Sequence, residues 1–386
     1  MKTSKSIYAI LCVTFLCAAF ILNGCSENES EEVSEAPVTE AVTDAEEAEE
    51  VQEVPEVQEV QENGPVEDVE EEPSEEPETV SEEPVTEAQE EASEEGPKEV
   101  DLIFFMGQSN MSGCGGNAAY APKVSEEKGY EFRAVSDPTR LYPITEPFGI
   151  NENNLNAIMD LPGAKKGSLV SAFINRYYEL TETPVVAVSA SAGATDTEFW
   201  MSDFVRADYE ERIKRAVVWL EANNYSIRHK YVVWLQGESD AIDNLSTEKY
   251  IENMDNIIRP MFINGVEKVF FITPGRTITR RDYFEKIIAA QIRMSQDSGY
   301  YALGTTVLSG ISTEYMVDEW HYNQTVLNLV GKECADSVAC YTLNRKECSL
   351  YNYRNKTTYL PGGDYFGKET VEPLDFSKCG LLTELK

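Results

Sequence analysis

From residue 100 onward, short apolar segments alternate with amphipathic ones, and this alternation restricts the possible folds more than any other feature. Five apolar runs have the length of buried strands: 100–106, 184–189, 231–235, 269–273 and, more weakly, 301–308. Segments with helical spacing follow them or lie between them: 168–181, 204–220, 247–262, 283–296 and 324–341. Strands that alternate with helices predict an α/β three-layer sandwich around a central parallel sheet of about five strands.

This architecture predicts where a site would lie, because binding and catalytic residues gather at the carboxyl ends of parallel strands. The stretch 116–167 shows no clear period and is expected to be a long loop that frames the site. The aromatic, irregular tail is expected to wrap the domain. We therefore expect a catalytic domain over 99–343 and a C-terminal extension over 344–386.

The acidic residues are concentrated in a segment without this alternation. Of the 69 Asp and Glu residues, 31 lie in residues 26–100, where Lys98 is the only basic residue. Residues 26–98 contain no aromatic residue and too little apolar surface to offset the entropy of ordering, so we expect a disordered linker. It would act as a stalk or simply as a solubilising segment. The rest of the chain is only mildly acidic, which argues against nucleic-acid binding.

The N-terminus has the pattern of an export signal. Lys2 and Lys5 precede an apolar run of 16 residues over 7–22, which is short for a membrane span. The run ends in Leu-Asn-Gly-Cys at 22–25, which resembles a bacterial lipobox. This resemblance implies that Cys25 is lipidated and that residues 1–25 are a signal peptide of an exported, membrane-anchored lipoprotein. A plain cleaved signal and an uncleaved anchor are the alternatives.

Five cysteines follow Cys25 and would lie in an oxidising compartment: Cys114, Cys334, Cys340, Cys348 and Cys379. Because the number is odd, at least one is free or pairs with another chain. We expect a Cys348–Cys379 disulfide, since it would hold the irregular tail. The chain has no Cys-x-x-Cys motif and only two histidines, so we expect no zinc site.

Ser109 follows the first expected strand by a Gly107-Gln108 turn. A serine at this edge, where a helix begins, can direct its own backbone N–H at a developing oxyanion. The segment is not a Gly-x-Ser-x-Gly elbow, because Met111 replaces the second glycine. Taken alone, Ser109 would be interpreted as a helix cap.

A histidine at the same edge strengthens the interpretation of Ser109 as a nucleophile. His321 follows the last expected strand, and Asp318 precedes it by three residues. A serine nucleophile needs an imidazole base, and a carboxylate fixes the tautomer of that base. His229, the other histidine, lies at the start of the third strand and hence at the wrong end of the sheet. Any serine–histidine pair is therefore Ser109 with His321.

Two further segments end expected strands. Gly193 follows the second strand, and Gln236 and Glu238 follow the third. A glycine lets a backbone N–H approach a reacting carbonyl, and Gln236 could donate from its side chain. Each segment could equally be a simple strand-to-helix turn. Cys114, in the glycine-rich loop after Ser109, is not expected to be the nucleophile.

The segments Gly107-Gln108-Ser109-Asn110-Met111, Trp234-Leu235-Gln236-Gly237-Glu238-Ser239-Asp240 and Asp318-Glu319-Trp320-His321 together resemble the SGNH/GDSL hydrolases. Within that superfamily they resemble the sialate O-acetylesterase and acetylxylan esterase branch, over about residues 100–342. The resemblance implies a flavodoxin-like sandwich and deacetylation of O-acetylated sugars without metal or cofactor. It also implies Ser109 as nucleophile, His321 as base, and Ser109 N–H, Gly193 N–H and Gln236 as oxyanion donors.

The carboxylate that orients His321 stays open at this point. Asp318 is favoured by the Asp-x-x-His spacing, and Glu238 is a second carboxylate at the same edge. The residues expected to contact an acetylated glycan are Gln108, Asn110, Thr195, Trp200 and Trp320. The alternatives to an esterase are a non-catalytic glycan-binding lipoprotein and an acyltransferase that uses the same triad.

Overall fold

The computed structural model describes residues 96–361 and 370–380. The predicted signal peptide, the predicted lipidation site Cys25 and nearly all of the acidic segment lie outside these residues. Among the helices described, none combines the length and the apolar composition that a membrane span requires.

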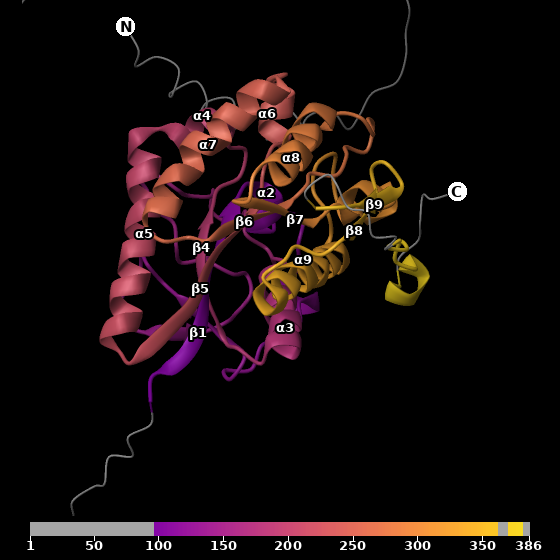
Figure 1. Ribbon diagram of the computed structural model, residues 1–386. Helices are drawn as coiled ribbons and strands as arrows, with labels where there is room; N and C mark the ends of the chain where they lie inside the picture. Colours follow the sequence, from indigo (N-terminus) through magenta and orange to yellow (C-terminus); the bar gives the residue numbers. More distant parts are fainter. Residues whose placement is uncertain (1–95, 362–369, 381–386) are drawn as a thin grey trace, which may run out of the picture. The chain divides into compact units, whose positions relative to one another are not determined.

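A mixed sheet of seven strands forms the centre of the fold (Figure 1). The strands are β1 (Lys98–Gly107), β2 (Gly129–Phe132), β3 (Leu141–Pro143), β4 (Val185–Ser191), β5 (Tyr225–Leu235), β6 (Lys268–Ile272) and β7 (Tyr301–Thr305). Their order is β3-β2-β4-β1-β5-β6-β7. The five strands expected from the sequence are parallel and adjacent, and their order is that of flavodoxin-like sheets. The predicted α/β sandwich is confirmed.

The expected count of about five strands was too low. Strands β2 and β3 lie inside 116–167, where only a loop was expected. β2 pairs with β4 in parallel, and β3 pairs with β2 antiparallel at the edge of the sheet. Strands of four and three residues are too short to show a period, so the sequence pattern could not reveal them.

Helices cover both faces of the sheet, as Figure 1 shows. One face carries α3 (Val170–Thr181) and α9 (Gln324–Asn344), and the other carries α5 (Asp203–Ala222), α7 (Thr247–Ile263) and α8 (Glu285–Asp297). Strand β4 is apolar on both sides because it serves both layers. Val186 and Val188 face the core under α5, and Val185 and Ala187 face the core under α3.

Short helices begin where the three central strands end. These are α2 (Ser109–Ser112) after β1, α4 (Thr197–Met201) after β4 and α6 (Glu238–Ile242) after β5. The 3₁₀ turns are η1 (Ala118–Tyr120), η2 (Val307–Gly310), η3 (Thr313–Tyr315) and η4 (Phe376–Cys379). The segments that carry Ser109, Gly193 and Gln236 therefore begin at one edge of the sheet.

The C-terminal extension forms a hairpin of β8 (Leu350–Asn352) and β9 (Thr357–Tyr359). The predicted Cys348–Cys379 disulfide is wrong: Cys348 bonds to Cys340, and Cys379 is exposed and free. Helix α9 ends at Arg345 with φ 54°, a left-handed conformation that reverses the chain. The reversal brings the Cα of Cys348 to 6.2 Å from that of Cys340.

Candidate active site

Ser109 is placed by a glycine turn at the end of β1. Gly107 has φ 141°, and a β-carbon there would lie 2.0 Å from the Leu235 carbonyl oxygen, so only glycine fits. The Gln108 N–H donates to the same carbonyl at 2.9 Å. The Gln108 side-chain oxygen accepts the N–H groups of Gly237 and Ser239, both at 3.3 Å. These contacts attach the turn on which Ser109 lies to the end of β5.

The side chain of Ser109 is largely buried, with 8% of the residue exposed. Within residues 96–361 and 370–380, neither its hydroxyl nor its backbone N–H takes part in a hydrogen bond. Both groups therefore remain able to engage a bound ester.

Asp318 and His321 form a local pair before α9. The Asp318 Oδ2 lies 2.8 Å from His321 Nδ1, and its Oδ1 accepts the backbone N–H groups of Trp320 and His321, each at 2.9 Å. Burial alone would raise the pKa of Asp318, but the hydrogen bonds from His321 and Trp320 outweigh it and hold that pKa below its ordinary value. An ionised Asp318 makes Nδ1 the protonated nitrogen and leaves Nε2 as the base.

Asn110 connects the serine segment to the histidine segment. Its Nδ2 donates to the Trp320 carbonyl at 3.2 Å, and its Oδ1 accepts the Tyr322 N–H at 3.3 Å. Because Asn110 follows Ser109, and Trp320 and Tyr322 flank His321, these bonds hold the two segments side by side. Asn110 is 2% exposed, so its role here is to position other residues rather than to form an open contact surface.

Glu238 lies behind Asn110. Its Oε1 accepts the Asn110 amide at 2.9 Å, and its Oε2 is buried without a partner in the described part of the chain. Burial raises the pKa of Glu238, and the Asn110 hydrogen bond offsets only part of that effect. Of the two carboxylates considered for His321, Asp318 contacts the ring and Glu238 contacts Asn110.

The structure contradicts Gln236 as an oxyanion donor. The residue is fully buried, and its Nε2 donates to the Thr195 carbonyl at 3.0 Å and to the Asp240 carboxylate. Its Oε1 accepts the Tyr250 hydroxyl at 3.2 Å. Since both amide hydrogens are used, Gln236 joins the ends of β4 and β5 and has no hydrogen left for a substrate.

Gly193 lies beside the serine, where the resemblance places an oxyanion donor. A β-carbon on Gly193 would be 3.6 Å from Ser109 Cβ. Its N–H, however, donates to Asp160 Oδ1 at 2.6 Å. In this structure, therefore, the Gly193 N–H contacts a carboxylate of the chain itself.

Trp200 was wrongly expected at the substrate surface. It has 0% exposure and packs on Trp234 with ring centroids 5.2 Å apart. Its indole N–H donates to Thr195 Oγ1 at 3.0 Å, and that hydroxyl donates to the Ala192 carbonyl. Trp200 and Thr195 therefore stabilise the turn after β4 from within the core.

Trp320 is the one half-buried residue in the expected substrate-binding set. Its ring lies 5.9 Å from that of Tyr283 and 6.3 Å from that of Phe284, measured between centroids. Tyr283 is also half-buried. This aromatic group is adjacent in sequence to His321.

Cys114 and His229, the other residues with nucleophilic or basic side chains considered from sequence, have different settings. Burial raises the pKa of the Cys114 thiol to about 12, which keeps it protonated near neutral pH. His229 lies within β5, six residues before its end, and contacts Glu267 at 3.1 Å.

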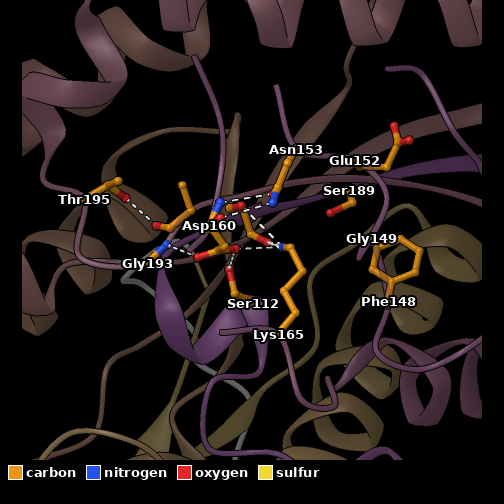
Figure 2. A network of polar contacts seen from close by, with 12 residues as sticks. Ser112, Phe148, Gly149, Glu152, Asn153, Asp160, Lys165, Ser189, Gly193 and Thr195 are labelled. Atoms are coloured by element: carbon orange, nitrogen blue, oxygen red, sulfur yellow. Dashed lines mark hydrogen bonds and ion pairs between the residues drawn. The ribbon is translucent and has the colours of Figure 1, made fainter. Parts of the chain in front are cut away.

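Sequence reasoning missed three residues that contact one another beside Gly193: Ser112, Asp160 and Lys165 (Figure 2). Asp160 and Lys165 belong to the aperiodic stretch 116–167, where neither a strand end nor a helical spacing marks them. An acidic and a basic residue five positions apart in such a stretch carry no signal of proximity to a nucleophile.

Several solved structures are similar to this chain at low identity. A protein from Arabidopsis thaliana is 19% identical, covers 64% of this chain and 99% of its own, and has a TM-score of 0.45. A carbohydrate acetylesterase from Xanthomonas citri is 14% identical over 65% of this chain and 58% of its own, with a TM-score of 0.42. An acetyl xylan esterase from Geobacillus stearothermophilus is 10% identical over 61% and 93%, with a TM-score of 0.36. A search of curated proteins gives no match.

The family comparison covers nearly all of the seven-stranded sheet. Residues 99–340 match the family described as carbohydrate esterase, sialic acid-specific acetylesterase, and this match spans more than half of the chain. The resemblance drawn from the three sequence segments is thereby confirmed at the level of the family. The chain belongs to the sialic acid-specific acetylesterase family of carbohydrate esterases.

Proposed function

We propose that this protein is a carbohydrate O-acetylesterase in which Ser109, His321 and Asp318 remove acetyl groups from sugar hydroxyls. The observation that carries the proposal is the Asp318–His321 pair, with its 2.8 Å contact, held against the serine segment by Asn110. Family membership supplies the substrate class, and this geometry supports the assignment of roles.

The reaction divides into two acyl transfers. His321 Nε2 removes the proton of Ser109 Oγ as that oxygen attacks the acetyl carbonyl, and Asp318 stabilises the imidazolium. The Ser109 N–H, which has no hydrogen-bond partner among the described residues, is a donor available to the oxyanion. His321 then protonates the departing sugar oxygen. Water attacks the acetyl-enzyme with His321 as base, and acetate leaves as the Ser109 hydroxyl is restored.

The sugar is proposed to lie against the half-buried pair of Trp320 and Tyr283. An aromatic face next to the base suits the apolar face of a pyranose, and the ester would then extend toward Ser109. The long stretch 116–167 and the C-terminal extension would limit which glycans fit.

We also propose export and lipid anchoring at Cys25, on the basis of the signal pattern at residues 1–25. The test is metabolic labelling with a fatty acid in a bacterial host. Wild-type protein should carry the label in the membrane fraction, and C25A should not. A labelled C25A variant would contradict the proposal.

The test of the function is acetate release from acetylated xylan, O-acetylated sialic acid and an aryl acetate. S109A and H321A should lower turnover by several orders of magnitude, and H229A, the matched histidine control, should match wild type. Wild-type turnover in S109A or H321A would rule out the mechanism. Acetyl groups that reach an added sugar acceptor rather than water would indicate an acyltransferase.

A further inference from the structure

A carboxylate outside the predicted triad, that of Asp160, contacts Gly193, Ser112 and Lys165 (Figure 2). Asp160 is 3% exposed. Its Oδ1 accepts the Gly193 N–H at 2.6 Å, and its Oδ2 accepts the Ser112 hydroxyl at 2.8 Å and lies 2.9 Å from Lys165 Nζ. Such a set of partners uses both oxygens of the carboxylate.

These contacts connect two segments that form the Ser109 site. Ser112 lies three residues after Ser109 on α2, and Gly193 lies just beyond the end of β4. A β-carbon on Gly193 would be 3.1 Å from Asp160 Oδ1 and 3.6 Å from Ser109 Cβ. Asp160 therefore sets the spacing between the nucleophile's helix and the turn beside it.

The backbone of Asp160 is itself fixed. Its N–H donates to Asn153 Oδ1 at 3.0 Å, and its carbonyl accepts the Asn153 amide at 3.1 Å. This reciprocal pair holds the otherwise aperiodic loop at the point where it reaches the site, as Figure 2 shows.

Lys165 compensates the charge of that carboxylate. Its side chain is 5% exposed, and its Nζ also contacts Ser191 Oγ at 2.8 Å and the Ser191 carbonyl at 3.4 Å. A buried carboxylate without such a partner is strongly unfavourable. It would also repel the negative charge that develops on an ester oxygen next to Ser109.

We propose that Asp160 and Lys165 are positioning residues for the Ser109 reaction, which rests on the proposed esterase function. Asp160 supplies an acceptor that holds α2 and the Gly193 turn in register, and Lys165 keeps that acceptor from adding net charge beside the oxyanion. In this arrangement the Gly193 N–H anchors the turn, and the oxyanion relies on the Ser109 N–H.

The test compares K165M, D160N/K165M and D160A/K165M, with turnover expressed per serine that reacts with a phosphonate ester. K165M leaves an unpaired carboxylate and should lower kcat roughly tenfold to 100-fold with KM changed less than about twofold. D160N/K165M retains an acceptor oxygen for the Gly193 N–H without either charge and should recover most of kcat. D160A/K165M lacks the acceptor and should not recover.

The matched control is E347Q, because Glu347 and Lys268 form another largely buried ion pair, at 2.5 Å, at the start of β6. E347Q should lower the melting temperature and leave kcat per reactive serine unchanged, since a pair remote from the Asp160 loop affects only the amount of folded protein. If wild type has activity that S109A abolishes, two results would overturn the proposal. One is a K165M variant with the kcat of wild type, and the other is a D160N/K165M variant that is no faster than K165M. An inactive wild type would overturn the esterase function and this proposal together.

Discussion

The Asp318 carboxylate holds both the ring and the backbone of His321. Its Oδ2 lies 2.8 Å from Nδ1, and its Oδ1 accepts the His321 N–H at 2.9 Å. A separation of three residues lets one turn fix the side chain, the tautomer and the backbone of the base together. The base is therefore oriented by its own segment, and Asn110 is needed only to bring that segment to Ser109.

Replacement of Asp318 by Asn should lower kcat on the order of 1,000- to 10,000-fold, because an amide permits the wrong tautomer of His321. The measurement is acetate release under saturating substrate. E314Q removes an exposed carboxylate from the same loop and should behave as wild type. A D318N variant within tenfold of wild type would assign the orienting role to another group.

Glu238 should respond differently to two substitutions. E238Q keeps an oxygen for the Asn110 amide and should stay within about threefold of wild type in kcat. E238A leaves one N–H of that buried amide unsatisfied, which costs about 1–3 kcal/mol and should displace the segment of His321. If Glu238 oriented His321 through its charge, E238Q would instead be as inactive as D318N.

Substitution of the two tryptophans expected to contact the substrate should have different effects, one on stability and the other on substrate binding. W200A should lower the free energy of unfolding by about 3–5 kcal/mol, measured by urea denaturation, because Trp200 is fully buried. W320A should leave that free energy almost unchanged and raise KM for an acetylated glycan roughly threefold to tenfold. An aryl acetate lacks the sugar, so its KM should not change in W320A.

Glu333 on α9 should make stability depend on pH. Burial raises the pKa of Glu333 from 4.5 to about 7, and repulsion from Asp336 contributes less to this increase. Since the folded state holds this proton more tightly than the unfolded state, stability falls as pH rises from about 4.5 to about 7.

E333Q should therefore raise the free energy of unfolding at pH 8 by on the order of 2 kcal/mol and change it little at pH 5. Urea denaturation at both pH values measures the difference. E221Q, at an exposed position of α5, should show no difference between the two pH values. Equal effects of E333Q at pH 5 and pH 8 would contradict the explanation.

The sequence pattern was sufficient to predict the features that show both a clear hydrophobic period and reactive residues at a defined place in it. Ser109 directly follows the end of β1, His321 lies between β7 and α9, and His229 is excluded because it lies within β5. The five predicted strands are apolar runs, which made their type accessible, whereas their order in the sheet is not encoded in such runs. The edge strands β2 and β3 escaped notice because they are short.

Other features depend on three-dimensional contacts that no local pattern encodes. Trp200 follows a strand end, as a site residue would, yet its ring turns into the core against Trp234. Gln236 has the right position for an oxyanion donor, but Thr195 and Asp240 use its amide hydrogens. Asp160 reaches Gly193 across 33 residues of sequence, a pairing that only the folded loop creates.

The central claim is that Ser109 is the activated nucleophile, and the most direct measurement is the intact mass of the protein after reaction with a serine-directed phosphonate ester. Wild type should gain one adduct that peptide mapping places on Ser109, and S125A, which lacks an exposed serine, should react equally. S109A should gain none, and H321A should react far more slowly. An unlabelled wild type, or an adduct of equal yield on S109A, would contradict the assignment.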